Sequence, residues 1–132
     1  MYDQMDHEDG VGGYCSNQVY ADTSGNIAYQ LIASVPIRKD KTPYIGQRIL
    51  DGTTSEFDWE TGKTTRIVDL PRSLNPSKGF IVNSNNRQAP DYAKYDYGAT
   101  QTTTARAVRL TEILKEKLSS NETIKFSEFA EI

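Results

Sequence analysis

The feature that most limits how this chain can fold is residues 36–75, a long stretch in which neither a helical nor a strand-like hydrophobic period is sustained. The stretch contains Pro36, Pro43 and Pro71, several glycines and the single tryptophan, Trp59. Proline removes a backbone donor and glycine favours turns, so this composition predicts a long ordered excursion over a surface in place of regular elements. Loops of this kind often carry binding sites.

The supply of apolar side chains is small for a self-contained core. The hydrophobic fraction of the 132 residues is 36%, and 8 of those residues are tyrosines. Leaving out tyrosine and adding glycine gives roughly 37%, against about 45–50% in ordinary globular domains. We therefore expect several aromatic and aliphatic groups to pack against protein outside this sequence.

Two strand-like runs near the start predict a β-hairpin. Residues 18–22 and 27–33 flank the polar segment 23–26, which contains a glycine. The preceding residues 1–16 are acidic and rich in glycine without any period, so we predict a disordered or non-native start and a partial domain over residues 17–132.

A turn, a short apolar run and a cluster of amides follow the long excursion. Residues 75–79 have turn composition, and residues 80–82 form a short apolar run that predicts a strand. Asn83, Asn85 and Asn86 come next. Their side chains either stabilise a turn or project an amide into a cleft, and the pattern leaves both readings open.

One amphipathic helix is predicted near the end of the chain. Its apolar stripe comprises Ala107, Leu110, Leu114 and Leu118, and its opposite face comprises Arg109, Glu112, Lys115 and Glu116. Thr103 or Thr104 is placed to cap its amino terminus. Residues 127–132 have the pattern of an N-cap, Ser127, followed by acidic first-turn residues, so we expect a second helix that begins here without being completed.

Charge and residue counts exclude several functions. A net charge of −3 and a pI near 5.1, with mixed charges, do not suit a nucleic-acid binder. No run of apolar residues is long enough for a membrane-spanning helix. Because His7 and Cys15 are the only residues of their types, the chain has no plausible set of nucleophile, base and orienting residue for acyl transfer. Any catalysis must use residues from elsewhere.

The order of short motifs along residues 17–132 resembles the penicillin acylase (penicillin amidase) family. The motifs that carry the resemblance are VYAD at 19–22, GNIAY at 25–29, VPIR at 35–38, DG at 51–52, DW at 58–59, LP at 70–71, NP at 75–76, GFIVNSNN at 79–86 and RAVRL at 106–110. No single motif is decisive, but so many matches in one order are not expected by chance.

The resemblance implies an α+β fold, as an incomplete part of the αββα sandwich of N-terminal-nucleophile hydrolases. It implies a hydrolase that cleaves linear acyl amides through an acyl-enzyme, without an organic cofactor. The acyl group stays open among penicillins, homoserine lactones and lipid amides. The nucleophile of that family is a serine exposed by self-cleavage, and the resemblance puts it upstream of this chain. We therefore expect the chain to be inactive alone and to act together with the remainder of a parent protein that bears the serine. The alternatives are a non-catalytic remnant or interaction module, and a subunit of a split enzyme.

The resemblance also assigns residues. Asn85 falls where the family has the asparagine whose side-chain N–H binds the oxyanion, although another register would select Asn83 or Asn86. Arg106 matches the arginine that positions groups near the nucleophile.

A structural calcium site is also implied. Asp96 corresponds to its aspartate ligand and Pro43 to a residue that contributes a backbone carbonyl, and the other ligands lie outside this chain.

Overall fold

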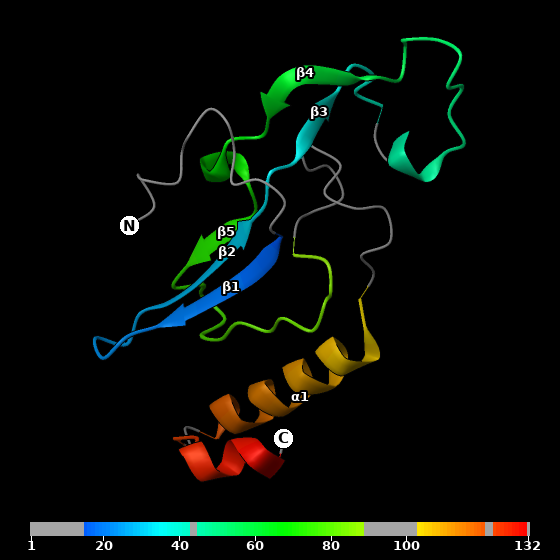
Figure 1. Ribbon diagram of the computed structural model, residues 1–132. Helices are drawn as coiled ribbons and strands as arrows, with labels where there is room; N and C mark the ends of the chain where they lie inside the picture. Colours follow the sequence, from blue (N-terminus) through cyan, green and yellow to red (C-terminus); the bar gives the residue numbers. More distant parts are fainter. Residues whose placement is uncertain (1–14, 43–44, 89–102, 121–122, 132) are drawn as a thin grey trace.

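The computed structural model describes residues 15–42, 45–88, 103–120 and 123–131 (Figure 1). Within these ranges the chain is a small mixed structure of short antiparallel strands and one α-helix, as expected for an incomplete α+β domain. The strands form two separate sheets, one ordered β1-β2-β5 and one ordered β3-β4. The α-helix lies below the larger sheet in Figure 1, and the smaller sheet extends from the opposite end.

The predicted hairpin is confirmed. β1 (Ser16–Ala21) and β2 (Ile27–Ile32) are antiparallel, with their ends paired from Ser16 opposite Ile32 to Ala21 opposite Ile27. Asp22 forms the turn, because its Oδ1 accepts hydrogen bonds from the backbone N–H groups of Ser24 and Asn26, both at 2.9 Å. Hydrogen bonds from Asn26 are the main reason that the pKa of Asp22 lies below its ordinary value.

The prediction of an irregular excursion over residues 36–75 is wrong. The segment contains the strands β3 (Pro36–Arg38), β4 (Trp59–Thr64) and β5 (Arg72–Leu74), together with short 3-10 turns. β5 pairs with β2 and so completes the three-stranded sheet. β3 and β5 are each three residues long, which is too short for a recognisable hydrophobic period, and β4 is largely exposed.

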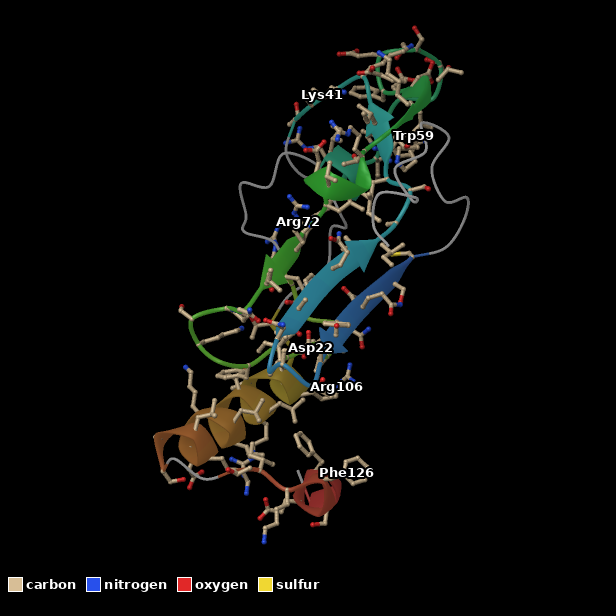
Figure 2. All side chains as sticks on the ribbon, turned by 90° about the vertical axis from the view of Figure 1, so that its left-hand side faces the viewer. Asp22, Lys41, Trp59, Arg72, Arg106 and Phe126 are labelled. Carbon is tan, nitrogen blue, oxygen red and sulfur yellow. The ribbon has the colours of Figure 1, made fainter. Side chains whose placement is uncertain are left out.

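Side-chain contacts hold the two-stranded ribbon of β3 and β4. The Arg38 guanidinium lies 3.6 Å from the centroid of the Trp59 ring, and Glu60 accepts from Lys41 at 2.7 Å and from Lys63 at 2.8 Å. Figure 2 shows Trp59 on this ribbon and Lys41 in the adjoining loop, both far from Arg106 on the helix. Hydrogen bonds from Lys41, followed by those from Lys63, lower the pKa of Glu60 from 4.5 to about 2.

The larger sheet carries the first of two hydrophobic clusters. Its buried members are Tyr29 and Leu31 from β2, and Ile67 and Leu70 from the segment that leads to β5. The Tyr29 hydroxyl donates a hydrogen bond to Asn17 Oδ1 at 2.6 Å, and burial raises the pKa of Tyr29 to about 12. This cluster joins the hairpin to the returning chain.

The extended segment 80–82 connects the first cluster to the second. Phe80 and Val82, each 8% exposed, pack with Ala107 of the helix, whereas Ile81 between them packs against the sheet cluster. Successive side chains therefore point to opposite sides, as in a strand. The prediction of a strand is nevertheless wrong, because the segment forms no strand pairing within the described residues.

The predicted helix is confirmed as α1 (Ala105–Ser119), and Thr104 is its N-cap. Ala107 is buried, and Leu110 and Leu114 pack against the same cluster. Leu118, the last member of the predicted stripe, is 41% exposed.

The second helix is also present, as the 3-10 helix η4 (Phe126–Glu131). Its start differs from the prediction, because the Glu128 carboxylate accepts from the backbone N–H of Lys125 at 2.7 Å and Ser127 lies within the helix.

Candidate active-site turn

The polar turn after Val82 is held by its own asparagines. Asn83 Oδ1 accepts from the backbone N–H of Asn85 at 3.3 Å, and Asn86 Oδ1 accepts from that of Ser84 at 2.9 Å. Asn85 has a φ of 60°, a left-handed conformation that non-glycine residues seldom adopt and asparagine adopts most readily. Two of the three asparagines thus use their carbonyl oxygens to hold the loop, as the turn interpretation of this cluster predicted.

Asn85 uses its side chain differently, because it meets an arginine from the helix. Arg106, in the first turn of α1, donates from Nη2 to Asn85 Oδ1 at 2.8 Å and to the backbone carbonyl of Ser84 at 3.1 Å. Figure 2 shows Arg106 at the amino-terminal end of the helix. The structure therefore brings together the two residues that the sequence analysis singled out, across a separation of 21 residues.

Further contacts join the helix to the turn. Thr104 Oγ1 accepts from the backbone N–H of Ala107 at 3.1 Å and donates to the Ser84 carbonyl at 3.1 Å. Gln88 Nε2 donates to the carbonyl of Val82 at 2.9 Å. The Ser84 carbonyl thus accepts two hydrogen bonds from the start of α1, and Ser84 is only 7% exposed.

The contact with Arg106 determines which way the Asn85 amide faces. A guanidinium has only donors, so it must meet the carbonyl oxygen of the amide, and the Nδ2 group then lies on the other side. Within the described part of the chain, Asn85 Nδ2 makes no hydrogen bond. Asn85 is solvent-exposed in the structure. The turn therefore presents an oriented neutral donor whose charge state does not depend on pH.

The two predicted calcium ligands, Asp96 and Pro43, lie outside the described residues. Within the described ranges no group of three or more His, Cys, Asp or Glu side chains is arranged to hold a metal ion. The calcium site stays a prediction that rests on the resemblance. Among the helices that the structure describes, none combines the length and the apolarity required to cross a membrane.

Sequence reasoning missed the contributions of Ser84 and Gln88. The first acts through its backbone carbonyl, which has no sequence signature, and the second through a long side chain that returns to residue 82. Thr104 was named only as one of two possible helix caps. Its second hydrogen bond, to the turn, links segments that are distant in sequence and has no local signal.

The α+β framework presents an oriented side-chain amide donor at a polar turn. Donors of this kind suit enzymes of acyl transfer, in which negative charge develops on a carbonyl oxygen. The family model for penicillin amidase matches residues 3–132 of the sequence. The chain belongs to the penicillin amidase family. The resemblance predicted from the motifs is thereby confirmed, and it places the chain among the hydrolases of that family.

Proposed function

We propose that this chain supplies the oxyanion-binding donor of an enzyme that hydrolyses linear acyl amides through an acyl-enzyme. Asn85 is the catalytic residue in this proposal, and Arg106 is a positioning residue that acts through it. The nucleophile is a serine contributed by residues outside this chain. The observation that carries the proposal is the 2.8 Å hydrogen bond from Arg106 Nη2 to Asn85 Oδ1.

The chemistry follows from the orientation of the amide. When the nucleophile adds to the substrate carbonyl, that oxygen acquires negative charge and its demand for hydrogen bonds rises. The N–H of Asn85 donates to this oxygen, and the Arg106 guanidinium on the far side of the amide draws electron density away and strengthens the donor. The stabilisation is larger in the transition state than in the ground state, so it raises the chemical rate.

The local contacts favour Asn85 over its neighbours for this role. Asn83 and Asn86 hold backbone N–H groups of the turn through their carbonyl oxygens. Asn86 Nδ2 also donates to the carbonyl of Arg87 at 3.4 Å. Within the part of the chain that the structure describes, Asn85 alone among the three has its carbonyl oxygen bound by a cation, which supports the register given by the motif alignment.

The sharpest test is Asn85→Asp in the complete enzyme. Aspartate has nearly the same shape, tolerates the left-handed backbone and keeps a contact with Arg106, but it has no N–H to donate and would repel an oxyanion. We expect kcat for a panel of N-acyl para-nitroanilides to fall by about a hundredfold or more, with the protein still folded.

Lys115→Ala, on the exposed face of α1, is the matched control and should keep full activity. If Asn85 only stabilises the turn, the Asp variant should remain active, because aspartate keeps the turn and forms an ion pair with Arg106 in place of the hydrogen bond. Near-normal turnover by that variant would refute the assignment.

The alternative of a non-catalytic interaction module draws support from exposed apolar groups. Phe126 is 93% exposed and Leu74 is 70% exposed, so both are available for contact with other protein. Both readings accommodate this feature, since an enzyme part also packs against the rest of its enzyme. Turnover that depends on Asn85 separates them, because an interaction module has no transition state to stabilise.

A further inference from the structure

We propose that Thr104 is a second positioning residue, which locks the Asn85 turn to the start of α1. This inference rests on the proposed role of Asn85 and extends it to a residue that the motifs did not single out. It depends on one hydroxyl group making two hydrogen bonds with different purposes, one within the helix and one to the turn.

The first bond belongs to the helix. Thr104 has an extended backbone, with φ −86° and ψ 149°, and its Oγ1 accepts from the N–H of Ala107 as an N-cap does. This bond fixes where α1 starts. Because Arg106 is in the first turn, the cap also determines where the guanidinium is held.

The second bond belongs to the turn. The same hydroxyl donates its proton to the carbonyl of Ser84, the residue directly before Asn85. Arg106 Nη2 donates to this same carbonyl, so the N-cap side chain and a first-turn side chain of the helix together hold one peptide group. A hydroxyl can accept and donate at once, which a capping Asp cannot do.

The position of the bound carbonyl explains why the clamp matters. The carbonyl of Ser84 and the N–H of Asn85 belong to one peptide unit, and that unit is planar. Holding its carbonyl therefore fixes the plane from which Asn85 enters its left-handed conformation at φ 60°. A residue in this region stays there only when its surroundings determine it, and here Asn83, Thr104 and Arg106 do so together.

The experiment compares three substitutions of Thr104 in the complete enzyme, with kcat and KM measured on N-acyl para-nitroanilides. Thr104→Val keeps the shape and loses both hydrogen bonds, whereas Thr104→Ser keeps both. Thr104→Asp separates the two roles, since aspartate is a good N-cap but cannot donate to a carbonyl. Thr103→Val is the matched control, because Thr103 is the exposed neighbour and differs by one position.

We expect Thr104→Val and Thr104→Asp each to lower kcat by about five- to tenfold at nearly unchanged KM, because Arg106 still holds the Ser84 carbonyl. Thr104→Ser should restore kcat, and Thr103→Val should leave it unchanged. A role confined to helix capping predicts normal kcat for the Asp variant, and that result overturns the inference. The Asp variant also provides the answer if the Val variant fails to fold.

A double substitution separates this inference from the proposed function. If Thr104 acts through Asn85, adding Thr104→Val to Asn85→Ala should cause no further loss of kcat. A full additional loss in that background overturns the inference and leaves the role of Asn85 intact. Normal kcat for Asn85→Ala overturns the proposed function and the inference with it.

Discussion

Replacement of Arg106 by methionine tests whether the guanidinium orients Asn85 or acts on the substrate itself. Methionine has a similar length and no hydrogen-bond donor, so the variant loses both bonds of Nη2, to Asn85 Oδ1 and to the Ser84 carbonyl. The turn should survive, because Asn83 still accepts from Asn85 N–H and Thr104 still donates to Ser84. What is lost is the fixed direction of the Asn85 amide.

The size of the effect follows from counting orientations. A freed asparagine has three staggered χ1 wells and two faces of its amide, about six arrangements, and selecting one of them costs about 1.1 kcal/mol. The hydrogen bond itself gives a second value for the loss. We take about 1.5 kcal/mol, the lower end of the range for a hydrogen bond to a charged group, because Asn85 is exposed. These two values correspond to a loss of kcat of about six- to thirteenfold.

The assay is steady-state hydrolysis of N-acyl para-nitroanilides by the complete enzyme, with the active fraction titrated for each variant. Arg109→Met, three residues along the same helix and exposed, is the control and should retain full activity. Arg106→Lys should fall between wild type and Arg106→Met, because an ammonium can donate to one oxygen but does not reproduce the shared geometry. A loss for Arg106→Met as large as that for Asn85→Asp would contradict the orienting role and indicate a direct one.

Two further predictions concern stability. Phe80→Ala leaves a cavity in the cluster that Phe80 forms with Val82 and Ala107. We expect the free energy of unfolding to fall by about 3 kcal/mol and amide hydrogen exchange in α1 to become about a hundredfold faster. Unchanged exchange in α1 would contradict this packing. The pKa of Glu60 is lowered from 4.5 to about 2. The stabilisation by the Glu60 carboxylate is therefore fully present above pH 4.5 and is lost as the pH falls toward 2. Protection of the β3-β4 ribbon from exchange should decrease across that interval in the wild type but not in Glu60→Gln.

The elements that could be predicted from sequence are those stabilised by near neighbours. The hairpin was recognisable because Asp22 and Gly25 form a local turn between two runs of strand-forming residues. α1 was recognisable because its apolar residues recur at helical spacing after a threonine cap. In both cases the interactions that define the element lie within a few residues.

The ribbon of β3 and β4 could not be predicted for the opposite reason. Its stabilising contacts join residues about twenty positions apart, such as Arg38 with Trp59 and Lys41 with Glu60. Its exposed side chains leave no alternating pattern. For segment 80–82 the sequence predicted a strand that the structure lacks. Its side chains alternate in direction as in a strand, but the described residues form no strand pairing with it.

The candidate site combines both situations. Asn85 and Arg106 were singled out through the family resemblance, but their mutual contact is a tertiary one that no local pattern encodes. The clamp by Thr104 is equally remote, because it joins residues that are 20 positions apart. The positions with proposed chemical roles were therefore accessible from motifs, whereas the interactions between them required the structure.

The choice of asparagine at position 85 can be understood from two requirements that few residues meet together. The turn demands a left-handed backbone, which glycine adopts freely and which asparagine and aspartate tolerate better than other side chains. The proposed chemistry demands a neutral N–H donor, which glycine lacks in its side chain and aspartate cannot supply. Of these three residues only asparagine meets both, and its carbonyl oxygen gives Arg106 a group to bind while the N–H stays available to the substrate in this proposal.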